Sequence, residues 1–173
     1  MFKRHALAAI ATATLALTAP AIGHADDAAL FAVYDQVNGF DIETATLGAV
    51  KGSSEEVRAL AAMVLRDHSA VRQMTRDLAK RLDVAYAIDA ASAGAADHEK
   101  AIGKLSALSG AEFDKAYLEH EIGFHRAAID AVKTSLLPAI ENAEFKGLVE
   151  AVLPGFEHHL AETLRVAGMP AAH

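Results

Sequence analysis

Three histidines stand on the apolar stripes of three different helical segments. The positions one turn before and after them are almost all apolar: Val64 and Val71 flank His68, Ile122 and Ile129 flank His125, and Phe156 and Thr163 flank His159. A side chain on such a stripe points toward the core when the segment is a helix. Imidazoles that face one another suit a borderline divalent cation, so these histidines are candidate ligands of zinc, iron, manganese or copper.

A carboxylate on a fourth segment could complete this set. Asp41 lies midway along the first helical segment of the mature chain, and mid-helix positions of an antiparallel bundle meet at one level. Glu121, one turn before His125, is a candidate hydrogen-bond partner of the ligands. Asp67 is a weaker candidate, because it points about 100° away from its neighbour His68 around the helix. The alternative is that all these residues are hydrogen-bonded core groups without a metal.

The residues around the histidines argue against a carboxylate-bridged pair of metal ions. A di-iron centre of the bundle type needs Glu-x-x-His on two helices. Here the residue three positions before each candidate histidine is apolar: Leu65, Ile122 and Phe156. A single, histidine-rich site therefore fits better.

Other reaction chemistries find no support in the residues. The chain has no cysteine, which excludes thiolate ligands and cysteine nucleophiles. Neither a serine nucleophile elbow nor a glycine-rich phosphate loop occurs. No catalytic residues are therefore assigned.

The remaining histidines of the mature chain are expected away from this cluster. His120 and His158 fall on the outward faces of their segments, and His98 and His173 fall on the surface or the tail. They are not counted as ligands.

Four long amphipathic segments must position the candidate site. Apolar residues at three- and four-residue spacing predict helices over residues 28–50, 55–82, 111–137 and 140–167. Gly52 and the serines after it separate the first two segments, and Pro138 separates the last two. Pro154 lies inside the last segment and is expected to kink it.

The connection between the second and third long helices is longer than the others. Residues 83–95 are expected to form a loop across the bundle end, and residues 96–108 a short extra helix. No alternating run of β-branched residues predicts a strand. The sequence therefore predicts an all-α protein: an antiparallel four-helix bundle with a short extra connecting helix between helices 2 and 3.

The N-terminal residues have the pattern of a signal peptide. A basic start is followed by an apolar run of about fourteen residues, which is too short to span a bilayer as a helix. Small residues allow cleavage after Ala25 or after Ala21. We therefore expect residues 1–25 to be a signal peptide and residues 26–173 to form a single domain, located in the periplasm or at the outer membrane. No transmembrane segment is expected in the mature chain.

The composition indicates a folded domain, and the net charge argues against a nucleic-acid partner. The chain has 173 residues, of which 53% are hydrophobic and 23% charged, values typical of a folded globular domain. The formal net charge is −7, and nucleic-acid binding needs a basic face, so no nucleic-acid partner is expected. Aromatic residues are 6% of the chain and tryptophan is absent, so alanine, leucine and valine must build the core.

Several segments resemble the bacterial domain of unknown function 4142 family. They are Asn38 to Glu43, Ser53 to Ala61 with Arg66-Asp67-His68, Phe113 to Leu118 with His125, and Leu153-Pro154 with His159-Leu160. The resemblance extends over nearly all of the mature chain. It implies a ferritin-like four-helix bundle in exported proteins that are often labelled outer-membrane proteins and that have no settled activity. Its recurring histidines match His68, His125 and His159, and its first-helix glutamate matches the shorter Asp41.

Two functions from different classes follow. The first is an exported bundle that binds one metal ion through the inward-facing histidines and Asp41. The second is a non-enzymatic envelope protein, without metal, that serves stress tolerance or binds an envelope protein partner.

Overall fold

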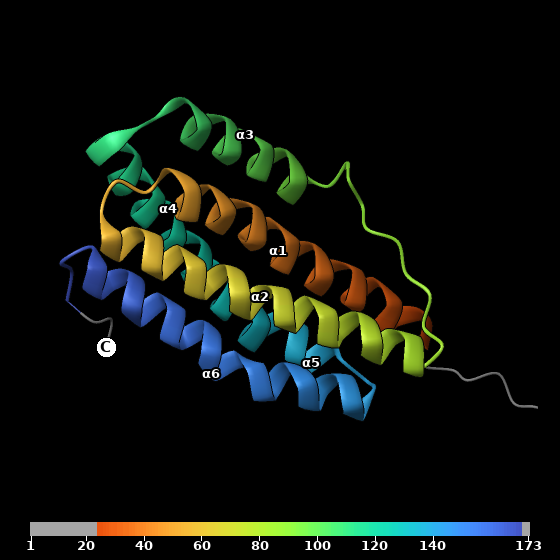
Figure 1. Cartoon of the computed structure of the whole chain (residues 1–173). Coiled ribbons are helices and arrows are strands. Elements are labelled where there is room, and N and C mark those ends of the chain that lie inside the picture. Colours follow the sequence, from red (N-terminus) through yellow and green to blue (C-terminus); the bar gives the residue numbers. More distant parts are fainter. Residues whose placement is uncertain (1–23, 171–173) are drawn as a thin grey trace, which may run out of the picture.

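The computed structural model describes residues 24–170, and this part of the chain is all helical (Figure 1). The elements are α1 (His24–Lys51), α2 (Glu55–Arg81), α3 (Ala93–Ala107), α4 (Gly110–Ala131), the π-helical segment η1 (Val132–Leu136), α5 (Leu137–Ala139) and α6 (Ala143–Val166). No strand occurs within the described range, and the predicted all-α fold is confirmed. The predicted signal peptide falls outside this range except for its last two residues. None of the described helices is both long and apolar enough to cross a membrane.

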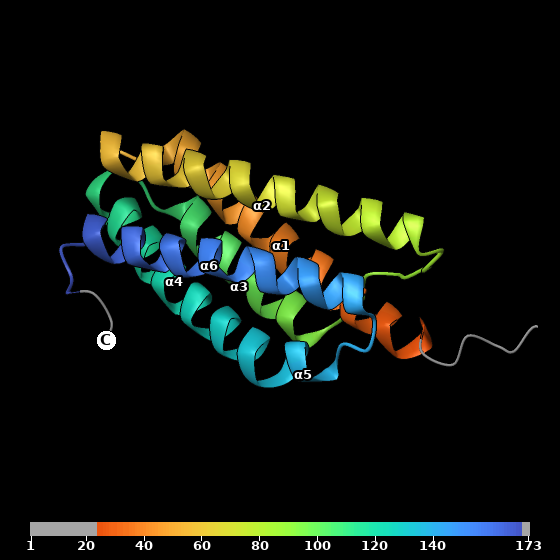
Figure 2. The ribbon, with the colours of Figure 1, turned by 90° about the horizontal axis from the view of Figure 1, so that it is seen from below.

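Helices α1, α2, α4 and α6 lie side by side. The pair α1 and α2 packs along its whole length, and α6 runs between α2 and α4 (Figure 2). Contacts of α1 with α4 close the arrangement into a ring. The short helix α3 lies outside this ring, against α1 and α4, after a long extended connection (Figure 1).

Side-chain caps fix where the helices begin. Ser54 accepts a hydrogen bond from the Val57 amide at the start of α2, and Asn142 accepts from the Phe145 amide at the start of α6. Ser92 caps α3 in the same way, so this helix begins at Ala93, three residues before the predicted start. Pro154 lies inside α6 on its exposed side, and the helix continues through it.

The third long helix differs from the prediction at its C-terminal end. Residues 111–137 were expected to form one α-helix, whereas η1 takes a π-helical course after Ala131. The Leu137 amide donates to the carbonyl of Val132, five residues back. The next residue, Pro138, has no N–H to continue the α-helical ladder, which explains why the pattern changes here.

The buried core consists of two hydrophobic clusters separated by a polar layer. One cluster lies around Phe31, Val71, Ile129 and Phe145, and the other around Ala45, Val64, Phe113 and Tyr117. Each of the four long helices contributes buried polar residues between or beside these clusters: Asn38, Asp41, Thr44, His68, Glu121, His125, His159 and Thr163. Such a layer costs desolvation free energy, which apolar residues at the same positions would avoid.

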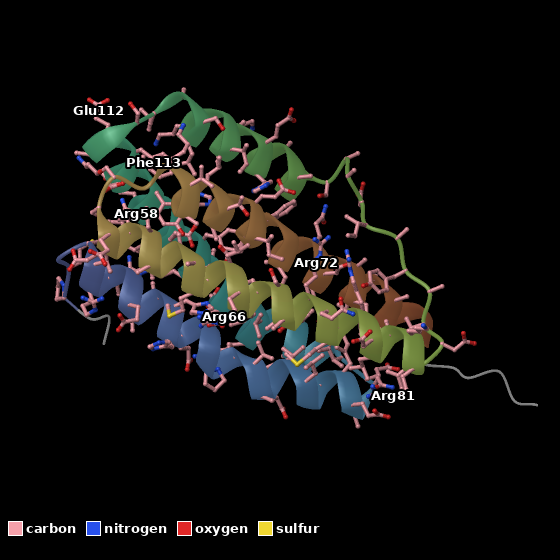
Figure 3. All side chains as sticks on the ribbon, in the orientation of Figure 1. Arg58, Arg66, Arg72, Arg81, Glu112 and Phe113 are labelled. Atoms are coloured by element: carbon pink, nitrogen blue, oxygen red, sulfur yellow. The ribbon has the colours of Figure 1, made fainter. Side chains whose placement is uncertain are left out.

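Asp35, a buried carboxylate outside the polar layer, connects α1 to α2 and to the segment after α2. Asp35 is 1% exposed and accepts hydrogen bonds from Arg72 and Arg76 on α2 and from the Tyr86 hydroxyl in the connection after α2. Every partner is a donor, so the buried charge is compensated. These contacts tie α1 to α2 and hold the extended connection against both. Figure 3 shows Arg72 reaching from α2 toward α1.

Gly48 allows a close approach of three helices. A Cβ built at this position would lie 2.6 Å from Tyr117 on α4 and 2.7 Å from the Cβ of Ala61 on α2. Tyr117 is fully buried and cannot move aside. The absence of a side chain at Gly48 therefore sets the spacing of the helices that carry the polar layer.

We predict that Gly48→Ala destabilises the protein by about 1–3 kcal/mol through overpacking, although alanine is the better helix former. The matched control is Gly147→Ala on α6, where nothing lies within 4 Å of the added Cβ; this change is expected to stabilise by up to about 1 kcal/mol. Chemical denaturation of the two variants measures both effects. Equal effects of the two substitutions would contradict the close packing at Gly48.

Candidate metal centre

The structure brings all four predicted site residues together. Asp41 comes from α1, His68 from α2, His125 from α4 and His159 from α6, and none is more than 3% exposed. The three imidazole rings have centroids 5.1 to 5.6 Å apart. His68, His125 and His159 form a group whose nitrogens lie within 4.8 Å of one another. Four elements distant in sequence thus converge on one buried point.

The atoms that face this point are close to one another. His68 Nε2 lies 2.8 Å from Asp41 Oδ2 and 3.2 Å from His159 Nδ1. His125 Nε2 lies 3.4 Å from the same carboxylate oxygen. Four ligands at about 2.0–2.1 Å around a tetrahedral zinc ion are about 3.3–3.4 Å from each other. The separations of 3.2 and 3.4 Å lie near this value, and the 2.8 Å contact between His68 and Asp41 is shorter.

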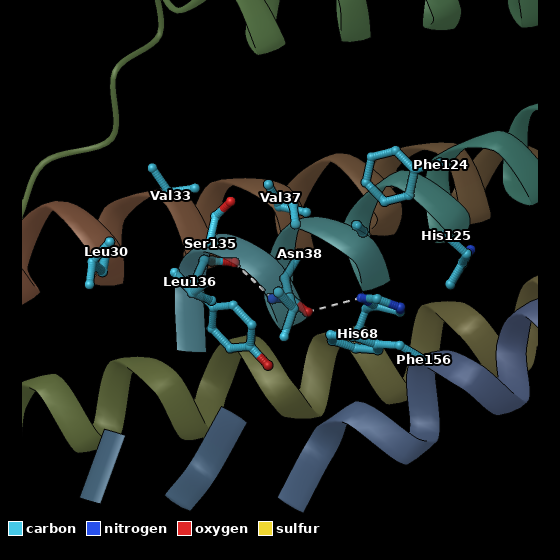
Figure 4. A pocket seen from close by; sticks show the side chains of 14 residues that line it. Leu30, Val33, Val37, Asn38, His68, Phe124, His125, Ser135, Leu136 and Phe156 are labelled. Carbon is cyan, nitrogen blue, oxygen red and sulfur yellow. Dashed lines mark hydrogen bonds between the residues drawn. The ribbon is translucent and has the colours of Figure 1, made fainter. Parts of the chain in front are cut away.

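Hydrogen bonds on the outer side of each ring decide which nitrogen faces the cluster. His68 Nδ1 lies 2.9 Å from Asn38 Oδ1 (Figure 4), and Asn38 Nδ2 donates to the Tyr34 carbonyl, which leaves only the amide oxygen for the histidine. His68 Nδ1 is therefore the donor, and its Nε2 is directed inward. Asn38, one turn before Asp41, was not predicted as part of the site, although its place on the same stripe indicates it.

Hydrogen bonds on their outer sides also orient the other two rings. His125 Nδ1 donates to the Glu121 carbonyl at 3.1 Å, and His159 Nε2 donates to Asp67 Oδ2 at 3.1 Å. Each ring thus turns one nitrogen lone pair toward the cluster, as a metal-binding histidine does. Asp67, the weaker of the two predicted partners, makes this contact across the α2–α6 interface.

The inward-facing atoms repel one another unless a cation lies among them. The contact of His68 with Asp41 is not aligned as a hydrogen bond, and both Asp41 Oδ2 and His125 Nε2 have no hydrogen-bond partner among the described residues. Burial alone raises the pKa of the Asp41 carboxyl, but His68 and His125 outweigh it and hold that pKa well below its usual range. A carboxylate and nitrogen lone pairs at such distances need either a proton or a metal ion.

Two of the inward-facing nitrogens lie within hydrogen-bond distance of each other, because His68 Nε2 is 3.2 Å from His159 Nδ1. Burial lowers the pKa of His125, and burial, opposed by the Asp67 carboxylate, lowers that of His159 to about 4. These two rings are therefore neutral at pH 7 and available as ligands.

Glu121 lies beside this cluster and is fully buried. Its two carboxyl oxygens have no hydrogen-bond partner among residues 24–170, and together with Asp41 and His125 it forms a second group of potential ligand atoms within 4.8 Å. Burial and the nearby Asp41 charge raise the pKa of the Glu121 carboxyl, so it holds a proton at neutral pH. The two groups share His125, and Asp41 Oδ2 lies 2.8 Å from His68 Nε2 and 3.4 Å from His125 Nε2. These contacts argue for one metal position with Glu121 at its edge.

Two histidines expected on the surface are partly buried instead. His98 stacks on Phe40 with centroids 4.4 Å apart and contacts Glu43 through Nε2 at 2.9 Å. His120 is half-buried and stacks on Phe124. The reason is that α3 covers this side of α1 and α4. His158 is exposed, as predicted, and His173 lies outside the described residues.

Comparison with known proteins gives a family but no activity. No curated protein and no solved structure matches the chain. A family model described as "Domain of unknown function (DUF4142)" matches residues 11–166. This match includes all four residues of the cluster and most of the chain. The chain therefore belongs to the DUF4142 family.

Proposed function

We propose that this protein binds a single divalent transition metal ion through His68, His125, His159 and Asp41. The observation that carries the proposal is the convergence of inward-facing acceptor atoms, from four helices, that need a cation among them. The donor set of imidazoles and one carboxylate, without thiolates, suits zinc, iron, manganese or copper. When bound, such an ion supplies Lewis acidity and, in the case of iron or copper, a one-electron couple.

The surrounding residues have defined roles in this proposal. Asn38, Asp67 and the Glu121 carbonyl orient the three rings. The two hydrophobic clusters pack on either side of the site. A di-iron centre needs a Glu-x-x-His motif on each of two helices, and the sequence has none. A mononuclear site is therefore proposed.

The proposed setting is the bacterial cell envelope. The basic and apolar pattern of residues 1–25, with cleavage after Ala25 or Ala21, supports export to the periplasm, with or without association with the outer membrane. A ferritin-like four-helix bundle is proposed for the arrangement of α1, α2, α4 and α6, supported by their ring of contacts. The competing function is a metal-free envelope scaffold, which the hydrogen bonds already made by His68 and His159 support.

Protein purified without chelators is expected to contain close to one equivalent of metal. Saturating metal should raise the melting temperature of the metal-free protein by about 5–10 °C. His125→Ala should remove both effects, whereas the control His158→Ala, an exposed residue next to His159, should retain them. Elemental analysis and thermal unfolding with and without zinc measure the outcome. Trace metal in wild type and His125→Ala alike would support the scaffold function instead.

Asp41 and Glu121, the two buried carboxyl groups beside the histidines, are expected to respond differently to replacement by the corresponding amide. Asp41→Asn should abolish stoichiometric binding, because it replaces a ligand oxygen that faces the ion. Glu121→Gln resembles the protonated acid and should retain one metal ion with affinity lowered about 10- to 100-fold, as for residues that support ligands. Isothermal titration with zinc distinguishes the two; identical losses would mean that Glu121 is itself a ligand.

Metal affinity is expected to fall with acidification. A histidine binds a metal ion only when its ligand nitrogen carries no proton, so metal binding competes with protonation of His159. Because the pKa of His159 is lowered to about 4, affinity should change little between pH 7 and pH 5 and should fall about tenfold per pH unit below pH 4. Competition with a chromophoric chelator at each pH measures this, and an affinity independent of pH would contradict the proton balance.

A further inference from the structure

An apolar pocket leads to the histidine cluster from the seam between α1 and α4. Its volume is about 230 Å³, and Figure 4 shows the side chains around it. At one end lie Val33, 52% exposed, and Ser135, which is also exposed. At the other end lie His68 and His125, both buried. The pocket therefore connects the surface to two of the proposed ligands.

The π-helical segment η1 forms part of the wall at the outer end. Val132, Ser135 and Leu136 of this segment line the pocket. A π-helical turn inserts one extra residue into the helix and is found often at functional sites. The departure from α-helical geometry thus occurs where the pocket reaches the surface.

The walls of the pocket are mostly apolar. Leu30, Val37, Phe124, Ala128 and Phe156 line it, and the Phe156 ring stacks on His68 with centroids 4.8 Å apart. Asn38 also lines the pocket, but its side-chain oxygen and nitrogen already contact His68 and the Tyr34 carbonyl. The other polar groups of the lining are the Ser135 hydroxyl at the outer end and the Tyr34 hydroxyl, which has no hydrogen-bond partner among the described residues. The only ionisable side chains of the lining that are proposed as metal ligands lie at the histidine end.

The volume of the pocket and the charge at its histidine end indicate the kind of ligand it would bind. An apolar cavity of about 150 Å³ binds benzene, so 230 Å³ suits a body somewhat larger than one six-membered ring. The proposed divalent ion would lie at the histidine end of the pocket, and its charge exceeds that of the one ligand carboxylate, Asp41. An anionic head group at that end would compensate the excess charge, which is favourable at low dielectric.

We infer that the pocket binds a small aromatic or branched aliphatic monoanion, such as a carboxylate or phenolate. Its apolar body lies against Val37, Phe124 and Ala128, and its charged head lies at the His68–His125 end. Zinc can expand to five ligands, so one additional oxygen does not require loss of a protein ligand. This inference rests on the proposed metal site for the head group, but the apolar body requires only the pocket.

Three probes distinguish binding through the charged head group from binding through the apolar body: benzoate, acetate and benzene. Isothermal titration is carried out on the full mature chain with and without zinc. We expect benzoate to bind the zinc-loaded protein at least tenfold more tightly than acetate does, and at least tenfold more tightly than it binds the metal-free protein. Benzene should bind the metal-free protein saturably.

A filling variant and its control complete the experiment. Ala128→Leu occupies the pocket from α4 and should weaken benzoate and benzene binding at least tenfold without loss of zinc. The control Ala151→Leu, an exposed position on α6, should leave all binding unchanged. Benzoate bound no more tightly than acetate, or unaffected by Ala128→Leu, would overturn the inference. If no zinc binds, the proposed function fails; benzene binding would still support the pocket, and its absence would overturn the pocket as well.

Discussion

The structure depends on one electrostatic constraint at the centre of its core. A carboxylate oxygen of Asp41 and ring nitrogens of His68 and His125 face one another at 2.8 to 3.4 Å, and His159 adds a third ring at 3.2 Å from His68. Asp41 Oδ2 and His125 Nε2 have no hydrogen-bond partner among the described residues. A cation satisfies them together, and a single proton satisfies only part of them. A bundle selected for stability alone would place leucine or valine here.

The rest of the fold keeps this group of atoms in place. Hydrophobic clusters on both sides of the polar layer fix the axial positions of the four long helices. Gly48 allows α1, α2 and α4 to approach closely, and Asp35 ties α1 to α2 near the other end. Asn38, Asp67 and the Glu121 carbonyl then set the rotation of each ring. Helix position and ring orientation are thus determined by different residues, and both are needed for four ligands to converge.

Helical periodicity was sufficient to predict the all-α fold and the inward direction of His68, His125 and His159. Helical periodicity also predicted that Asp41 lies at the level of the three histidines, because mid-helix positions meet in antiparallel packing. It could not predict which ring nitrogen faces inward, since that depends on partners such as Asn38 on another helix. The burial of His98 and His120 depends on where α3 packs, and the π-helical course of η1 depends on the hydrogen bond that Pro138 cannot make. The burial of these two histidines is an effect of tertiary structure, and the π-helical course is an effect of local geometry. The spacing of apolar residues along the sequence indicates neither.

X-ray absorption at the zinc edge reports directly which atoms surround the bound ion. For protein loaded with one equivalent of zinc, we predict about four nitrogen and oxygen ligands at about 2.0–2.1 Å. We also predict outer scattering from three imidazole rings, with one ring fewer in His125→Ala if residual zinc is retained. A shell of oxygen atoms alone, or an imidazole signal unchanged when His68, His125 and His159 are replaced together, would contradict coordination by these histidines.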